Sequence, residues 1–466
     1  MRLSERAIFT IFLTLVVMVT FVYYGPFLHN YFTFDDFALI EHAVQGPKAT
    51  LLGYNCTLRF VNNVVWIPLN IFFGFDPFGY NFFSLLLWLL NALLVYRFLR
   101  RLLDDALPAA LVGFIFAATA IGADAVFWRA ASGTLINVSF YLLTLHAYTV
   151  FRQTGETRQW RISLIFFILA IFSKEEAASL PLVVLLLEWL YFNGRSDARG
   201  VIRRFLTYSA IVVATIVMNY IVIFQIMHAQ SELVHISKFR PLHTLFSSWT
   251  VFFLTPDGRL VMGDLRIYIT VALISTSFFV VKDRRLLFFG FGWIFLTFLP
   301  QSLSNISQFE PSYLFSSLSR HLYLPSIGAA MIYVAIIVGL RDRFSKNVAV
   351  TTSLLFMLIF LPYNYSLVSS RGVQWRSEGE PSKYLLHAIQ QTFPDFPPNT
   401  YIYVNGAPRA YILQALRGLY KNFTMNWIVD PRNFKPKPGE TAIIIDCNWQ
   451  PDGDVRLQLY NLEQVQ

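Results

Sequence analysis

Long apolar runs separated by short polar segments dominate the chain. A helix needs about 20 mostly apolar residues to cross the hydrocarbon core of a bilayer. Eleven runs approach this length with few or no charges, and each predicts a transmembrane helix: residues 7–24, 80–96, 106–122, 134–150, 162–172, 177–192, 205–227, 267–281, 286–303, 322–340 and 347–366. The charges of residues 173–176 separate two of the shorter runs, which predicts a helical hairpin with a charged tip.

The distribution of basic residues predicts the orientation of these spans. Arg and Lys collect on cytoplasmic loops of membrane proteins. In this chain they cluster at the N-terminus and after every second span: Arg2/Arg6, Arg97–Arg101, Arg152–Arg161, Arg195–Arg204, Lys282–Arg285 and Arg341–Lys346. We therefore expect a cytoplasmic N-terminus and an extracytoplasmic C-terminus. The apolar stretch 241–256 is interpreted as interfacial or re-entrant, because a span there would break the alternation.

The pattern changes after residue 366. Pro, Asn and charged residues occur there in ordinary proportion, residues 401–404 and 442–445 predict strands, and residues 408–420 predict a helix. The predicted fold is an all-α polytopic membrane protein over residues 1–366, followed by a small α/β extracytoplasmic domain over residues 367–466.

Composition agrees with a membrane protein. Hydrophobic residues make up 55% of the chain and charged residues 14%, with a mean hydropathy of +0.50, whereas soluble proteins carry about 25% charged residues. The net charge of +9 is therefore assigned to cytoplasmic loops and not to nucleic-acid binding.

Several kinds of chemistry have no support in the sequence. Two cysteines, Cys56 and Cys447, are too few for a disulfide framework or a Cys-based metal site. Both fall on the predicted outer side, which leaves a disulfide between them open. A Gly-rich phosphate loop, a zinc signature and a Gly-x-Ser-x-Gly elbow are absent from the sequence. The outer histidines are too scattered to predict a metal site: His29, His235 and His243.

Two adjacent carboxylates, Asp35 and Asp36, follow the first span on the predicted outer side. Neighbouring like charges raise one pKa, which suits a general base near neutral pH. The alternative is a helix N-cap, in which Asp35 satisfies free N–H groups ahead of residues 37–40. Both interpretations can hold for different members of the pair.

A second polar group joins Asp124, Trp128 and Arg129 between the third and fourth spans. An acid, an indole and a guanidinium can together hold a sugar and a phosphate, since Arg donates forked hydrogen bonds to phosphate oxygens. The alternative is an anchor at the membrane interface, where Trp and snorkelling Arg are common.

Two more groups lie on the same predicted side. Lys174 and Glu175 at the hairpin tip form either a surface ion pair or a contact for an anionic head group. Arg320, followed by His321 and Tyr323, lies on an outer loop against the positive-inside trend. Arg320 is interpreted as a phosphate ligand or as a snorkelling Arg beside a Tyr anchor.

In their order along the chain, these motifs resemble the GT-C membrane glycosyltransferases. This group includes protein O-mannosyltransferases and aminoarabinose lipid A transferases. The resemblance covers residues 1–340 and is strongest to the tetratricopeptide-carrying transmembrane O-mannosyltransferases and their bacterial relatives. It rests on Asp35-Asp36, Asp124-Ala125-Val126, Lys174-Glu175 before Pro181, and Arg320-x-x-Tyr323-x-Pro325-Ser326. The chain departs from the family at Ala120-Ile121, where His-Pro is frequent, and no tetratricopeptide array follows the last span.

The resemblance implies an inverting transfer of a sugar from a polyprenyl-phosphate donor to a hydroxyl of a glycan, lipid or protein acceptor. Asp35 is the expected general base, with Asp36 or Asp124 orienting the acceptor. Lys174 and Arg320, with Arg129, are expected to hold the leaving phosphate. The other expected substrate-binding residues are Trp128, Glu175, His321 and Tyr323.

No cofactor or metal is expected, and the expected partners are the donor, the acceptor and membrane lipids, without nucleic acid. The expected location is a bacterial inner membrane, with the active site and the C-terminal domain on the periplasmic side. A transporter or flippase, or a polymerase or ligase, of lipid-linked glycans remains an alternative. Transporters place polar residues near the bilayer midplane within repeats, whereas these acids lie at outer helix ends and no internal repeat is evident.

Overall fold

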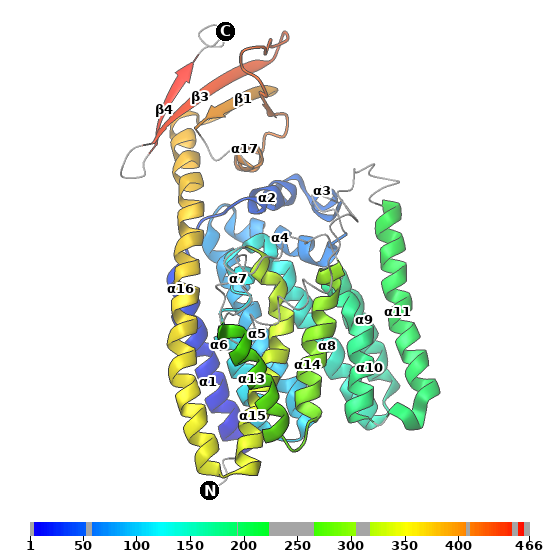
Figure 1. Cartoon of the computed structure of the whole chain (residues 1–466). Coiled ribbons are helices and arrows are strands. Elements are labelled where there is room, and N and C mark those ends of the chain that lie inside the picture. The colour runs from blue at the N-terminus through cyan, green and yellow to red at the C-terminus, as the bar shows by residue number, and fades with distance from the viewer. Residues whose placement is uncertain are drawn as a thin grey trace.

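The computed structural model describes residues 4–52, 58–192, 194–222, 265–303, 317–406, 411–449 and 455–460. Within these residues, long roughly parallel helices form a bundle, short helices cover one end of it, and a small sheet lies beyond that end (Figure 1).

Every predicted span corresponds to a helix of the bundle. These helices are α1 (Glu5–Tyr24), α5 (Pro77–Leu103), α6 (Ala106–Ala118), α8 (Ser132–Thr154), α9 (Thr157–Ile171), α10 (Leu180–Tyr191), α11 (Ala198–Tyr220), α13 (Leu265–Val280), α14 (Arg285–Leu303), α15 (Tyr323–Arg343) and α16 (Lys346–Thr392). Among the described residues, six helices are long and apolar enough to cross a membrane: α1, α5, α8, α11, α15 and α16. The mostly helical membrane fold is confirmed, and the count of eleven spans stays a prediction.

Short helices and turns carry the residues singled out from the sequence. The helices are α2 (Asp35–Gln45), α3 (Pro47–Leu52), α4 (Phe60–Phe73) and α7 (Asp124–Phe127). The 3-10 turns are η1 (Gly25–Phe27), η2 (Arg129–Ala131), η3 (Glu175–Ser179), η4 (Gly194–Asp197) and η8 (Ser317–Leu322). The described parts of these loops are thus folded, which gives their polar side chains fixed positions.

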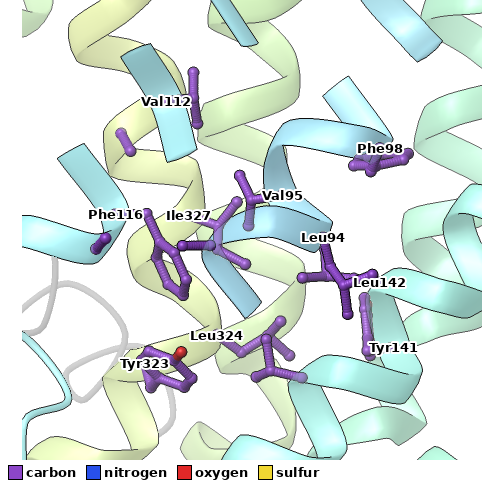
Figure 2. Packing of buried hydrophobic residues seen from close by; sticks show 14 of the residues in the cluster. Leu94, Val95, Phe98, Val112, Phe116, Tyr141, Leu142, Tyr323, Leu324 and Ile327 are labelled. Atoms are coloured by element: carbon purple, nitrogen blue, oxygen red, sulfur yellow. The ribbon is translucent and has the colours of Figure 1, made fainter. Parts of the chain in front are cut away.

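Aromatic and aliphatic side chains fill the space between the bundle helices (Figure 2). The Tyr323 ring stacks on the Trp88 ring at a centroid distance of 4.7 Å and lies 5.0 Å from the Phe116 ring. Its hydroxyl accepts a hydrogen bond of 3.2 Å from Asn91 Nδ2. These contacts fix the beginning of α15, and with it the position of η8, against α5 and α6.

The helix α16 connects the bundle to the C-terminal sheet. With 47 residues and a rise of about 1.5 Å per residue, it runs without interruption past residue 366. The predicted domain boundary therefore lies inside this helix, and the division into two domains stays a prediction.

A four-stranded sheet follows α16. Its order is β2-β1-β3-β4, made of β1 (Thr400–Asn405), β2 (Asn426–Trp427), β3 (Thr441–Trp449) and β4 (Val455–Tyr460). β1 pairs in parallel with β2 and β3, and β4 is antiparallel to β3. The helix α17 (Ile412–Tyr420) packs against α2, and their apolar residues share one core. The predicted strands lie within β1 and β3, and the predicted helix overlaps α17.

Some predictions fall outside the described residues. These predictions concern Cys56, His235, the segment 241–256, which contains His243, and most of the loop 304–321. Cys447 lies on β3 and forms no disulfide with any described residue.

Candidate active site

Asp36 lies in the first turn of α2 and is completely buried. Its Oδ2 accepts hydrogen bonds from Arg129 Nε at 2.9 Å and from the Thr33 N–H at 3.0 Å, and its Oδ1 accepts one from the Ala130 N–H at 2.7 Å. Burial raises the pKa of the Asp36 carboxyl, and the opposing effects of Arg129 and the two N–H groups are smaller. Asp36 thus ties α2 to η2 and has no acceptor position directed to solvent.

Arg129 is the other half of this buried ion pair, with 1% of its side chain exposed. Its guanidinium also donates to Asn81 Oδ1 at 3.0 Å, to the Phe127 carbonyl at 2.9 Å and to the Tyr31 carbonyl. Through these hydrogen bonds, Arg129 of η2 links the segment that contains Tyr31 and Asp36 to Asn81 of α5. Its contacts therefore connect three segments that are separate in the chain.

Asp35 differs from its neighbour because it is partly exposed. It begins α2, where a carboxylate is stabilised by the helix dipole. The preceding residue, Phe34, has a φ of 44°, a left-handed conformation that is costly for a bulky residue. The Phe34 ring is 43% exposed and meets the Trp375 ring edge-on at 6.5 Å. Asp35 therefore occupies a strained, solvent-accessible turn.

Asp124 is completely buried at the beginning of α7. Its Oδ1 accepts hydrogen bonds of 2.6 Å from both Arg371 Nε and Trp375 Nε1, and its Oδ2 accepts one from the Ser319 hydroxyl. Three donors from two distant segments thus hold this carboxylate in one orientation.

Trp375, which donates to Asp124, is part of a layered stack of cations and rings. The Arg320 guanidinium lies over the Trp128 ring at 4.4 Å, and Trp128 stacks on Trp375 at 5.9 Å. Arg371 lies on Trp375 at 5.3 Å. The charges of Asp35 and Asp124 act on Arg320 together with those of Arg59 and Glu176. Arg320 therefore lies within electrostatic reach of both Asp35 and Asp124.

Lys174 lies at the hairpin tip but is 3% exposed and not on the surface. Its ammonium pairs with Glu176 Oε1 at 2.7 Å, donates to Thr134 Oγ1 at 2.8 Å and lies 3.3 Å from His321 Nδ1. Burial lowers the pKa of Lys174, and Glu176 opposes this effect. His321 Nδ1 lies 2.8 Å from the same Glu176 oxygen. Lys174 and His321 thus share one buried network.

Glu175, the neighbour of Lys174, pairs with Arg59. The Arg59 guanidinium reaches it with two hydrogen bonds, of 3.1 Å and 2.8 Å. The Glu175 side chain is 45% exposed and the Arg59 side chain is 27% exposed. This forked pair forms a more accessible edge of the site than Lys174 does.

Eight of the ten predicted site residues make the contacts described above at one end of the bundle, and Asp35 lies next to Asp36 there. Tyr323 differs, since its ring is buried in the helical core described above. The roles assigned to all ten residues stay predictions.

Three residues of the site are not identified from the sequence: Arg59, Arg371 and Trp375. Glu176 belongs to the predicted charged tip but has no role assigned from the sequence. Arg59 is an arginine on the predicted outer side, and the same deviation that singled out Arg320 identifies it. Arg371 and Trp375 lie just beyond the last predicted span, where an apolar pattern gives no reason to continue the membrane domain. Within the described residues, no three His, Cys, Asp or Glu side chains gather in a way that could hold a metal ion. The expectation of no cofactor stays a prediction.

Comparisons with known proteins agree with this architecture. Residues 60–224, about a third of the chain, match the family model described as dolichyl-phosphate-mannose-protein mannosyltransferase. No curated protein matches the chain in sequence.

Three solved structures share the fold. The oligosaccharyltransferase of Archaeoglobus fulgidus in its apo form has a TM-score of 0.53 at 12% identity, covering 89% of this chain and 64% of its own. The archaeal oligosaccharyltransferase AglB of the same organism, in complex with an inhibitory peptide and a dolichol-phosphate, has a TM-score of 0.52 at 12% identity, with 91% and 64% covered. ArnT of Cupriavidus metallidurans in the apo state has a TM-score of 0.50 at 13% identity, with 95% and 93% covered.

The chain spans less than two thirds of the length of the archaeal proteins. Identities of 12–13% show a common fold. The predicted resemblance to GT-C membrane glycosyltransferases is therefore confirmed, in the matched segment and in the fold of this multi-pass membrane protein.

Proposed function

We propose that the chain transfers a sugar from a polyprenyl-phosphate donor to an acceptor hydroxyl, with inversion at the anomeric carbon. The family description names a dolichyl-phosphate-linked mannose, and one structure of similar fold holds a dolichol-phosphate. Both support a lipid-phosphate donor.

The observation that carries this proposal is the difference between three neighbouring carboxylates. Asp36 and Asp124 are completely buried, and each accepts three hydrogen bonds. Asp35 is partly exposed on a strained turn, and its charge acts on Arg320. A base must reach the proton that it removes, which favours Asp35 as the base and leaves Asp36 and Asp124 as residues that position the site.

In the proposed reaction, the acceptor oxygen attacks the anomeric carbon while its proton passes to the Asp35 carboxylate. The bond from the anomeric carbon to the phosphate oxygen breaks, and polyprenyl phosphate leaves with the electron pair. Arg320 and Arg59 stabilise the developing negative charge, since cations fixed in advance in a water-poor site are effective there. The Trp128 ring, which packs against the Arg320 guanidinium, holds it in position.

Lys174 acts at one remove in this scheme. Its ammonium is already engaged by Glu176 and Thr134, and His321 lies beside it. We infer that Lys174 contributes positive potential and holds the hairpin tip, while Glu175 orients Arg59. Arg129 likewise acts through Asp36 and not on the phosphate.

The acceptor is a hydroxyl of a glycan, lipid or protein on the extracytoplasmic side. The alternation of basic loops supports this side, and we propose a periplasmic site in a bacterial inner membrane. A nucleotide sugar is not the proposed donor, because nucleotide sugars are absent outside the cytoplasm.

The experiment supplies purified protein with a labelled polyprenyl-phosphate sugar and measures release of polyprenyl phosphate. We expect release by the wild type and a loss of about 10²- to 10⁴-fold in Asp35→Asn, the usual contribution of a general base. Glu380→Gln is the matched control, since Glu380 is an exposed acid on α16. Full release in Asp35→Asn would contradict the base assignment, and donor binding without release would favour a transporter.

A further inference from the structure

One stretch of α16 contacts both segments that carry the candidate carboxylates. This stretch, residues 371–379, is called the clamp segment below. It lies between the predicted end of the last span and the C-terminal sheet, in the middle of the long helix of Figure 1. The family resemblance does not include it, because the matched motifs end near residue 340.

The clamp segment holds Asp124 directly. Arg371 Nε and Trp375 Nε1 both donate to Asp124 Oδ1 at 2.6 Å, although they are 247 and 251 residues away in sequence. All three side chains are almost completely buried. Hydrogen bonds to a buried charge are among the stronger ones, because an unmet carboxylate oxygen there is costly.

The clamp segment also holds the loop that leads to Asp35. Asn30 Nδ2 donates to the Gly372 carbonyl at 2.9 Å. In the opposite direction, Arg376 donates to Asn30 Oδ1 at 3.3 Å and to the Pro26 carbonyl at 2.8 Å. These bonds fasten both ends of the segment 26–30, a few residues before Asp35.

Two glycines allow this close approach. A Cβ atom at Gly372 would lie 2.6 Å from the Phe27 ring, and one at Gly379 would lie 2.7 Å from the Tyr31 carbonyl oxygen. Both distances are shorter than van der Waals contact. The helix and the loop therefore touch along two turns, and this contact has no room for a larger residue.

The same helix carries the C-terminal sheet, which in turn reaches α2. Arg417 of α17 lies 3.5 Å from Glu41 of α2 and donates to the Met425 carbonyl. Leu385 and Ile389 of α16 pack in one core with residues of α2. α2, which begins with Asp35, is thus in contact with both α16 and α17.

We propose that the clamp segment is a positioning element of the active site. Arg371 and Trp375 orient Asp124, and Arg376 fixes the loop before Asp35, so that the two carboxylates keep a constant separation. None of these three residues is a catalytic residue. The inference rests on the proposed transferase function for its kinetic consequences, but its structural part does not depend on that function.

The first experiment is a double-mutant cycle on the rate of polyprenyl phosphate release. Trp375→Phe keeps an aromatic ring at this position but removes the indole N–H that donates a hydrogen bond to Asp124. We expect a loss of about 10- to 100-fold in kcat, since one charge-assisted hydrogen bond is removed. In an Asp124→Asn background the same substitution should add less than about twofold, because residues acting through one another are not additive.

Val373→Ala is the matched control, since Val373 is an exposed neighbour on the same helix. Arg371→Lys is the second variant, in case Trp375→Phe does not fold, and should show the same dependence on Asp124. An equal loss in both backgrounds, or no loss in the wild-type background, would overturn the assignment for Asp124.

The second experiment needs no catalysis. A nitroxide label is attached at Phe34→Cys in a background of Cys56→Ser and Cys447→Ser, and its mobility is measured by electron paramagnetic resonance. Arg376→Gln should increase the mobility of the label, and Val373→Ala should leave it unchanged. An unchanged spectrum in Arg376→Gln would overturn the assignment for the loop.

The two experiments separate the two ideas. If the wild type releases no polyprenyl phosphate while the label loosens in Arg376→Gln, the transferase proposal fails and the clamp segment stands. The clamp proposal fails and the transferase proposal stands under three joint results. The wild type is active, Trp375→Phe is equally active, and Arg376→Gln leaves the mobility of the label unchanged.

Discussion

Replacing Asp36 with asparagine removes one charge from a completely buried ion pair. The Asp36 and Arg129 side chains are 0% and 1% exposed, and the carboxylate oxygens accept from three donors. Asparagine offers one acceptor oxygen and places an N–H₂ group against these donors. The Arg129 charge is then left without compensation.

Breaking a buried pair by removing one partner costs about 3–5 kcal/mol. We expect Asp36→Asn to lower the free energy of unfolding by an amount in this range. Asp35→Asn should cost no more than about 1 kcal/mol, the usual value for a partly exposed acid at a helix N-terminus. Adjacent and chemically identical substitutions are thus expected to differ in stability by at least about 2 kcal/mol.

The assay is equilibrium unfolding in mixed micelles of dodecyl maltoside and dodecyl sulfate, with release of polyprenyl phosphate measured on the same preparations. Asp35→Asn should lose activity and keep its stability, whereas Asp36→Asn should lose stability. The double variant Asp36→Asn/Arg129→Met should lose less stability than the sum of the losses of the two single variants. The difference should be about 0.5–3 kcal/mol, because the two residues are directly coupled. Equal stability of Asp35→Asn and Asp36→Asn, or strictly additive costs, would refute the reasoning.

Three further predictions concern other parts of the chain. Arg320→Gln should lower kcat by about 10²- to 10³-fold, the usual effect of removing one fixed stabilising group, while Arg320→Lys should retain part of the rate, and steady-state kinetics distinguish them. Glu188→Gln should lower stability by about 3–5 kcal/mol, since Glu188 is buried between two arginines, and mixed-micelle unfolding measures it; an unchanged midpoint would contradict this. Burial raises the pKa of Cys447 from 9.0 to about 11. In the Cys56→Ser variant, the Cys447 thiol should therefore be alkylated about 100-fold more slowly at pH 8 in the folded protein than in the unfolded chain, and the rate should rise as the pH approaches 11. A rate in the folded protein equal to that of the unfolded chain would count against this prediction.

The helices could be predicted from the sequence because their cause is local. Every backbone polar group of a membrane span must form its hydrogen bond within the segment. An apolar run of sufficient length therefore predicts a helix without information from the rest of the chain. The prediction was least complete around α2, α4 and α7, which are short, partly polar and supported by packing against other segments.

The candidate site could be predicted only in part. Arg320 is identified because it is basic on the predicted outer side, and Asp124 because it is an acid at the end of a predicted span. Arg371 and Trp375 give no such signal, because a polar residue after a membrane span is ordinary. Only their contact with Asp124 gives them significance.

The sequence by itself determined the helices of the bundle, and it predicted their orientation and most of the polar groups at one end of the bundle. The tertiary structure decided how these groups are paired. It joined Asp36 to Arg129 across 93 residues and Asp124 to Arg371 across 247, and it left Asp35 as the partly exposed member of its pair. The physical reason is that burial and charge pairing depend on segments far apart in the chain, whereas the apolar pattern of a span acts on its own residues.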